Sequence, residues 1–371
     1  MMRPMVSDRV VASFEIRSTR YVAPDGKVLG TLPDWAHDRK TLVELYRAMT
    51  LTRAFDERAV ALQRSGQLGT FASSLGQEAV AVGVASAMRE RDVLVPSFRE
   101  QGAQFWRGVT LVELLLYWGG DERGSDFAGP REDFPVSVPV GSHASHAAGV
   151  AMAFQLRREP RVAVCVIGDG GTSKGDFYEA LNFAGVRSLP VLFVVNNNQW
   201  AISVPRWAQT AAVTLAQKAV AAGIHGEQVD GNDVIAVRER AGVLMERARD
   251  GNGPAVLEAV TYRLTDHTTA DDASRYRNAE EVSAHWGLEP LARVRTLLVE
   301  QGWWGREEEE RLLAEVRDQV ESAVQEYLAA EPAPATVMFD YLYAVVPRPL
   351  VAQREEVARR FPGERVVTDS G

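Results

Sequence analysis

Runs of apolar residues alternate with amphipathic stretches through the middle of the chain. Residues 162–167 form an apolar, largely β-branched run that ends at Gly168, and residues 191–195 form a second run that ends in asparagines. Between the two runs, residues 176–184 have the spacing of an amphipathic helix. This order predicts a βαβ unit, whose two strands are parallel and buried on both faces.

The alternation continues towards the C-terminus. It predicts a helix over residues 209–222, a short strand at 228–229, a helix over 234–250 and a strand over 255–260. Repeated segments of this kind predict an α/β fold with a doubly wound, mostly parallel sheet flanked by helices. In such folds ligands bind beyond the carboxyl ends of the strands.

The flanking parts of the chain are expected to be helical or irregular. Apolar residues recur on one helical face from Thr41 until Gly66 ends the pattern, and residues 77–88 and 307–329 also have helical patterns. Residues 1–40 contain turn formers without periodicity. We therefore divide the chain into an N-terminal arm (1–40), an α/β domain (41–300) and a helical C-terminal segment (301–371).

The composition narrows the class of protein. The 371 residues carry a formal net charge of -9, which argues against a nucleic-acid surface, because phosphate backbones are bound by clustered Lys and Arg. The first 18 residues lack the apolar core of a signal peptide, and no run approaches the ~20 apolar residues that span a bilayer. The single cysteine, Cys165, excludes an intramolecular disulfide and lies in a predicted buried strand. We expect a cytoplasmic protein with no nucleic-acid or membrane partner.

Polar residues follow both strands of the predicted βαβ unit. Asp169, Gly170 and Gly171 come directly after the first strand, and Asn198 follows the second. Both groups are expected at one edge of the sheet, because the strands are parallel and adjacent. Glycine N–H groups and a helix N-terminus can hold a diphosphate. Asp169, the Asn198 amide oxygen and a main-chain carbonyl near Trp200 are the hard oxygen ligands that Mg²⁺ prefers.

Each of these motifs also has a plainer explanation. A Gly-Asp-Gly after a strand is usually a turn, and an asparagine run is usually a loop that tolerates left-handed backbone. Their joint occurrence on consecutive strands favours a binding site. The stretch lacks the third glycine of a dinucleotide fingerprint, and Lys174 lacks the glycine spacing of a phosphate-binding loop.

Other polar residues are weaker candidates. His143 and His146 share one helical face, but no acid or cysteine completes a zinc site. His143 could still line an active-site entrance. Residues 307–310 are expected to be the solvated first turn of a helix. No Gly-x-Ser-x-Gly elbow is present, and Cys165 is too apolar in context to be a nucleophile.

Several segments resemble one enzyme family. Residues 168–184 (GDGGTSKGDFYEALNFA) and 197–203 (NNQWAIS) are similar to the thiamine-diphosphate motif of the α subunits of pyruvate and branched-chain 2-oxo acid dehydrogenases. Residues 76–79 (GQEA), 98–100 (FRE) and 262–277 match segments of that family in the same order. The resemblance covers roughly residues 40–300 and implies the thiamine-diphosphate-binding fold.

The resemblance implies roles for individual residues. Asp169, Asn198 and the Trp200 carbonyl would hold Mg²⁺. The other cofactor contacts would come from Phe98, Arg99, Val138, Val140, Gly170, Gly171 and His267. Arg99 and the backbone of the two glycines would bind the diphosphate, while the backbone of Val138 and Val140 would touch the aminopyrimidine side. A guanidinium suits phosphate oxygens, although Arg99 could instead form a surface ion pair with Glu100 or another acid.

His267 lies in a polar loop just after a predicted strand. A lone loop histidine is usually solvated, but the family places a histidine at the active-site mouth, where it contacts the diphosphate and assists acyl transfer. We therefore predict that His267 is catalytic. Arg263, Asp271 and Asp272 either order this loop by ion pairing or keep it soluble. Thr268 stands where mitochondrial relatives carry a phosphorylated serine, so regulation by that route stays an open question.

The resemblance also implies the activity and the partners. The expected reaction is oxidative decarboxylation of pyruvate or a branched-chain 2-oxo acid with thiamine diphosphate and Mg²⁺, followed by acyl transfer to the lipoyl group of an acyltransferase component. In this family the glutamate that activates thiamine comes from a separate β chain, so we expect an α2β2 heterotetramer. Two alternatives stay open: an acetoin dehydrogenase α subunit and a non-catalytic diphosphate-binding α/β module.

Overall fold

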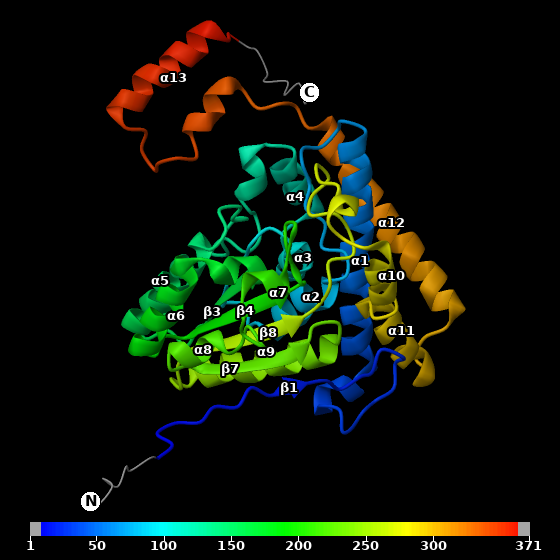
Figure 1. The fold of residues 1–371 in the computed structure, drawn as a ribbon. Helices are drawn as coiled ribbons and strands as arrows, with labels where there is room; N and C mark the ends of the chain where they lie inside the picture. The colour runs from blue at the N-terminus through cyan, green and yellow to red at the C-terminus, as the bar shows by residue number, and fades with distance from the viewer. Residues whose placement is uncertain (1–8, 363–371) are drawn as a thin grey trace, which may run out of the picture.

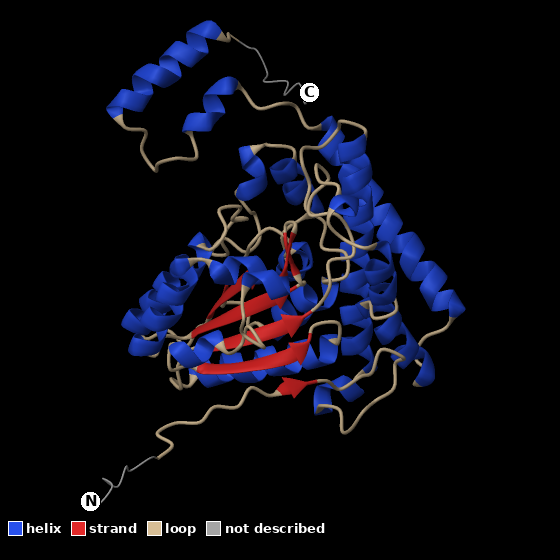
Figure 2. Ribbon diagram, viewed as in Figure 1, coloured by secondary structure: helices blue, strands red, loops and turns tan. Residues whose placement is uncertain are grey.

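A parallel sheet forms the centre of the molecule. The computed structural model describes residues 9–362. The six strands of the sheet are Ser18–Thr19 (β1), Val93–Val95 (β2), Ala163–Gly168 (β3), Val191–Asn197 (β4), His225–Asp230 (β7) and Ala255–Val260 (β8). Their order is β1-β7-β8-β4-β3-β2, and every neighbouring pair is parallel. Helices lie on both sides of this sheet (Figure 2). The predicted α/β fold is therefore confirmed.

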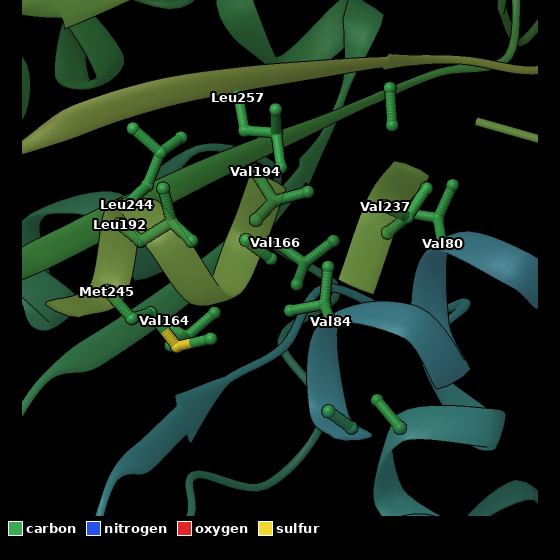
Figure 3. Close-up of a cluster of buried hydrophobic side chains, with 14 of the residues drawn as sticks. Val80, Val84, Val164, Val166, Leu192, Val194, Val237, Leu244, Met245 and Leu257 are labelled. Atoms are coloured by element: carbon green, nitrogen blue, oxygen red, sulfur yellow. The ribbon is translucent and has the colours of Figure 1, made fainter. Parts of the chain in front are cut away.

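Each face of the sheet carries its own helical layer. The helices of one layer are Glu78–Ala87 (α2), Gln101–Arg107 (α3) and Val234–Arg249 (α9), and those of the other are Ser142–Arg157 (α5) and Gly175–Arg187 (α6). Alternate strand residues point to opposite layers: Val164 and Val166 pack in the first core (Figure 3), Cys165 and Ile167 in the second. Strands buried on both faces need continuous apolar runs, which explains why the sequence predicted them.

Further helices pack beside the first layer. They are Arg39–Arg64 (α1), Leu111–Trp118 (α4), Pro290–Glu300 (α11) and Arg306–Ala329 (α12) (Figure 1). Helix Ala279–Trp286 (α10) instead packs against Tyr262, which follows β8. Asp38 caps α1 by accepting hydrogen bonds from the N–H groups of Lys40 and Thr41, as expected for a carboxylate at a helix N-terminus. The remaining elements are the hairpin Trp200–Ala201 (β5) and Val204–Pro205 (β6) and the 3₁₀ turns Asp34–His37, Glu122–Ser125, Asp169–Ser173, Ala273–Arg275 and Ala335–Phe339.

The register of β3 and β4 decides where the polar motifs lie. Gly168 is opposite Asn196 in this parallel pair. Asp169 follows Gly168 by one residue, and Asn198 follows Asn196 by two. Both motifs therefore leave the sheet at the same carboxyl edge.

The predicted helix over residues 209–222 is wrong. A short helix, Arg206–Gln209 (α7), ends where the segment begins, and a second, Lys218–Ala221 (α8), lies near its end; the chain between them is irregular. The backbone N–H groups of Leu215 and Ala216 donate to the buried Glu258 carboxylate, at 2.8 and 3.1 Å, instead of to helical carbonyls. This contact with Glu258 takes the place of the helical hydrogen bonds that the local pattern predicted. The predicted strand at residues 228–229 is present and forms the middle of the six-residue strand β7.

The two ends of the described chain differ in how they pack against the central domain. The N-terminal arm joins the sheet, because Ser18 and Thr19 pair with Gln228 and Val229 of β7. Helix Arg348–Arg360 (α13) extends away from the body (Figure 1). Within residues 9–362 no helix is long and apolar enough to cross a bilayer. The three-part division of the chain stays a prediction.

Candidate active site

A cavity of about 620 Å³ opens at the carboxyl edge of β3 and β4. Every residue that the sequence nominated for cofactor, metal or catalysis lines it: Phe98, Arg99, Val138, Val140, Asp169, Gly170, Gly171, Asn198, Trp200 and His267. These residues come from segments that are far apart in the sequence, so the fold itself brings them together.

His143 does not line this cavity. It lies in the first turn of α5, its ring is buried, and its Nε2 atom is 2.9 Å from the Val166 carbonyl oxygen of β3. The expectation that His143 lines the entrance is therefore wrong, because this side of the helix faces the sheet.

The turn after β3 presents Asp169 and two glycines to the cavity. The Asp169 carboxylate is buried and accepts a hydrogen bond of 3.0 Å from Gln209 Nε2. Burial raises the pKa of this carboxyl group, as expected where water no longer solvates the charge. At Gly170, an added Cβ atom would lie 2.5 Å from the Ala201 Cβ atom. Only glycine lets the turn and Ala201 approach this closely.

The turn after β4 supplies neutral oxygens. Asn198 donates from Nδ2 to Gln77 Oε1 at 2.9 Å, and its Oδ1 atom accepts from the Trp200 N–H at 3.2 Å. Gln199 has a left-handed φ of 71°, which turns the chain sharply between these two residues. The amide oxygen of Asn198 is thereby fixed at the cavity wall.

These oxygens fit a magnesium ion better than a softer metal. Within residues 9–362 no group of three His, Cys, Asp or Glu could hold a metal. The cavity is instead lined by two carboxyl residues, Asp169 and Glu100, together with Asn198 and Trp200. The Trp200 carbonyl accepts from Arg263 Nη1 at 3.4 Å. Mg²⁺ takes few protein carboxylates and completes its shell with water and phosphate oxygens.

Arg99 is buried at the cavity wall without a carboxylate partner among the described residues. Its Nη1 atom donates to the Ser73 carbonyl at 2.5 Å, and its Nη2 atom donates to the His267 carbonyl at 2.6 Å. Glu100 accepts from the backbone N–H of Arg99, so the two residues do not form the surface ion pair considered above. Burial, and then the nearby Arg263, lowers the pKa of Arg99 to about 10.

A second guanidinium, that of Arg263, lies beside the first. Arg263 is fully buried and donates from Nη2 to the Ile202 carbonyl at 2.7 Å and to the Tyr276 hydroxyl at 3.0 Å. Asp271 accepts from the His267 N–H and from Tyr276, so it orders the loop through these groups. Two buried cations with neutral hydrogen-bond partners create a positive region that favours an anionic ligand.

His267 is neutral in this environment. Burial first, and then Arg99 and Arg263, lowers the pKa of His267 to about 4. The Nδ1 atom is 3.0 Å from Arg99 Nη2 and 3.3 Å from Arg263 Nη1. Because guanidinium nitrogens can only donate, Nδ1 must accept, and the ring hydrogen resides on Nε2.

The sequence predicted no role for several residues around the site. Asp56 of α1 is buried, and its Oδ2 atom accepts from Ser73 Oγ and from the Ser74 N–H, both at 2.6 Å. These contacts hold the segment whose Ser73 carbonyl orients Arg99. The one sequence signal for Asp56 is an acid on the apolar face of a predicted helix, next to Phe55.

Comparison with known proteins identifies the family. Residues 46–335 match the family described as dehydrogenase E1 component. This chain belongs to that family. It is 41% identical over 357 residues to the 3-methyl-2-oxobutanoate dehydrogenase subunit alpha of Mycobacterium tuberculosis, covering 94% of this chain and 95% of that relative.

Two further relatives carry a different substrate in their names. The chain is 40% identical over 344 residues to the pyruvate dehydrogenase E1 component subunit alpha of Acholeplasma laidlawii, covering 91% of this chain and 99% of the relative. It is 38% identical over 325 residues to the protein of the same name from Staphylococcus aureus, covering 87% of each. The family expected from the sequence is thus confirmed, and both named substrates occur at similar identity.

Proposed function

We propose that this E1 component is the α subunit of a 2-oxo acid dehydrogenase complex that uses thiamine diphosphate and Mg²⁺. The observation that carries the proposal is the pair of buried guanidiniums, Arg99 and Arg263, which lie without ion pairs among the described residues beside a cavity lined by Asp169 and two glycines. Such a cavity suits a diphosphate with its cation better than an uncharged ligand.

The residues of this chain would divide the binding between them. Arg99 and the backbone N–H groups of Gly170 and Gly171 would hold the diphosphate. Asp169, Asn198 and the Trp200 carbonyl would hold Mg²⁺, which neutralises the phosphate oxygens. Phe98, Val138 and Val140 would border the organic part of the cofactor.

Bound thiamine diphosphate supplies the nucleophilic carbon and the electron sink for decarboxylation. The part of this chain is to bind, orient and exclude water. His267 would donate its Nε2 hydrogen to oxygen atoms that become negative in the cavity, and the lowered pKa that keeps its ring neutral supports this role. We therefore assign the catalytic role within this chain to His267.

The remaining parts of the machinery would come from partners. We infer an α2β2 heterotetramer in which the β chain supplies the glutamate that activates thiamine. A lipoyl-bearing acyltransferase component would accept the acyl group. The whole assembly would work in the cytoplasm.

Calorimetry with the α/β assembly tests the cofactor. Thiamine diphosphate should bind only in the presence of Mg²⁺, and Asp169→Ala should abolish this binding. Asp318→Ala removes an exposed carboxylate from α12, where the side chain is 80% exposed, and serves as the matched control. Binding that survives without Mg²⁺ or in Asp169→Ala would contradict the proposed role of this carboxylate.

A substrate panel tests the reaction. The reconstituted assembly should decarboxylate pyruvate or 3-methyl-2-oxobutanoate and transfer the acyl group to lipoyl acceptors, whereas this chain alone should be inactive. Preference for acetoin would assign the chain to the acetoin dehydrogenase class instead. Full activity of the isolated chain would contradict the role given to the β chain.

A further inference from the structure

A buried lysine lies behind the turn that carries Asp169. Lys218, in α8, is only 6% exposed. Its Nζ atom donates to the Thr172 carbonyl at 2.6 Å and to the Thr172 hydroxyl at 2.9 Å. That hydroxyl in turn donates to the Asp169 carbonyl at 2.7 Å. The ammonium group and the turn therefore form one hydrogen-bonded unit.

The charge of Lys218 has no counter-ion in the described part of the chain. Both hydrogen bonds of its Nζ atom go to neutral oxygens, and the ring of Tyr178 lies 5.2 Å away. Burial lowers the pKa of Lys218, and the charged neighbour that adds to this effect is another cation, Arg206. A buried ammonium is costly unless something negative compensates it.

The position of Lys218 makes the ligand of the adjacent cavity the candidate for that compensation. Gly170 and Gly171 face the cavity from the same turn that Lys218 holds, whereas Lys218 itself is not among the lining residues. Its charge would therefore act through the turn, without contact. The electrostatic attraction between the Lys218 ammonium group and an anionic ligand increases with the charge of the ligand.

We propose that Lys218 is a positioning residue for the diphosphate: it shapes the Asp169–Ser173 turn and places a compensating positive charge behind it. This inference rests on the proposed function, because it takes thiamine diphosphate as the ligand. It assigns to Lys218 a share in the preference for diphosphate over less charged forms of the cofactor.

Three versions of the chain separate charge from hydrogen bonding. Lys218→Gln keeps a donor for Thr172 and removes the charge, while Lys218→Arg keeps both. Lys40→Gln removes an exposed lysine of α1, whose side chain is 82% exposed, and controls for net charge. Each is assembled with the β chain and titrated calorimetrically with thiamine diphosphate and with thiamine monophosphate, in Mg²⁺.

We expect the loss of affinity to be larger for the ligand with the higher charge. Lys218→Gln should weaken thiamine diphosphate binding roughly tenfold and thiamine monophosphate binding less, while Lys218→Arg and Lys40→Gln should stay within about threefold of wild type. Equal loss for both ligands, or wild-type affinity in Lys218→Gln, would overturn the charge role. Absence of thiamine diphosphate binding in the wild-type assembly would overturn the proposed function itself, which is a distinguishable result.

Discussion

Arg99 contacts His267 at two atoms: Arg99 Nη2 lies 2.6 Å from the His267 backbone carbonyl oxygen and 3.0 Å from the ring Nδ1 atom. The same guanidinium reaches the Ser73 carbonyl through Nη1. One buried side chain thus links the segment after α1, the cavity wall and the loop that carries the proposed catalytic histidine.

This contact predicts that His267 stays neutral at physiological pH. Its pKa is lowered to about 4 by burial and by two cations, so its ring should not titrate between about pH 5.5 and 8. Arg99→Met should raise the pKa towards the ordinary value. NMR of ring-labelled histidine, with His267→Gln to assign the signal, measures both. A midpoint near pH 6.5 in the wild-type chain would refute the contact.

The low pKa of His267 also affects stability. Because the folded pKa lies below the unfolded value of about 6.5, the unfolded chain binds the extra proton first as the pH falls. His267 should therefore cost stability progressively between about pH 6.5 and pH 4. The pH dependence of urea unfolding should be shallower in His267→Gln over this window.

Asp56 should act in the opposite direction. Burial raises its pKa to about 7, so the folded chain binds a proton that the unfolded chain, with a pKa near 4, has already lost. The free energy of unfolding should fall as the pH rises from about 4 to about 7, by on the order of 1.4 kcal/mol for each tenfold drop in proton concentration. Asp56→Asn should flatten this slope in denaturation experiments, and Asp318→Asn should leave it unchanged.

Gly170 should tolerate a side chain only if Ala201 loses its own. The Cβ atom of Gly170→Ala would lie 2.5 Å from the Ala201 Cβ atom, so the turn must shift, and thiamine diphosphate affinity should fall about tenfold or more. Adding Ala201→Gly should restore most of the loss in calorimetry. Gly175→Ala, where no atom lies within 4 Å of the new Cβ, should have little effect. If the double variant does not regain thiamine diphosphate affinity, the steric clash with Ala201 is not the reason for the loss.

Arg99→Lys should weaken diphosphate binding even though it keeps the charge. The guanidinium donates to the Ser73 and His267 carbonyls from two separate nitrogen atoms, an arrangement that the single nitrogen of an ammonium group does not reproduce. We expect a loss of roughly 10- to 100-fold in affinity, corresponding to one or two charge-assisted hydrogen bonds. Wild-type affinity in this variant would show that diphosphate binding does not need the guanidinium.

The central sheet could be predicted from the sequence because its strands are buried on both faces. Residues 163–168 and 191–197 are mostly apolar, and their polar endings had to meet once the strands were parallel neighbours. The same reasoning nominated Asp169 and Asn198 together. It also indicated Gly170, Gly171 and a carbonyl near Trp200, whereas Phe98, Arg99, Val138, Val140 and His267 came from the family resemblance.

Contacts between distant segments could not be predicted in this way. The segment 209–222 looks helical, but the Glu258 carboxylate takes its backbone N–H groups from more than 40 residues away. Asp56 and Lys218 likewise act on turns that are remote in sequence, 17 and 46 residues from their partners Ser73 and Thr172. The local hydrophobic pattern around a residue does not indicate which distant residue it will contact.

Cys165, the single cysteine of the chain, is fully buried within β3, and burial raises the pKa of its thiol. A thiol that stays protonated and out of contact with solvent should not react with maleimides. The native protein should therefore not be labelled by thiol-reactive probes. A cysteine introduced at the 78% exposed Trp207 could carry a fluorophore and report assembly with other subunits in real time, without any further substitution.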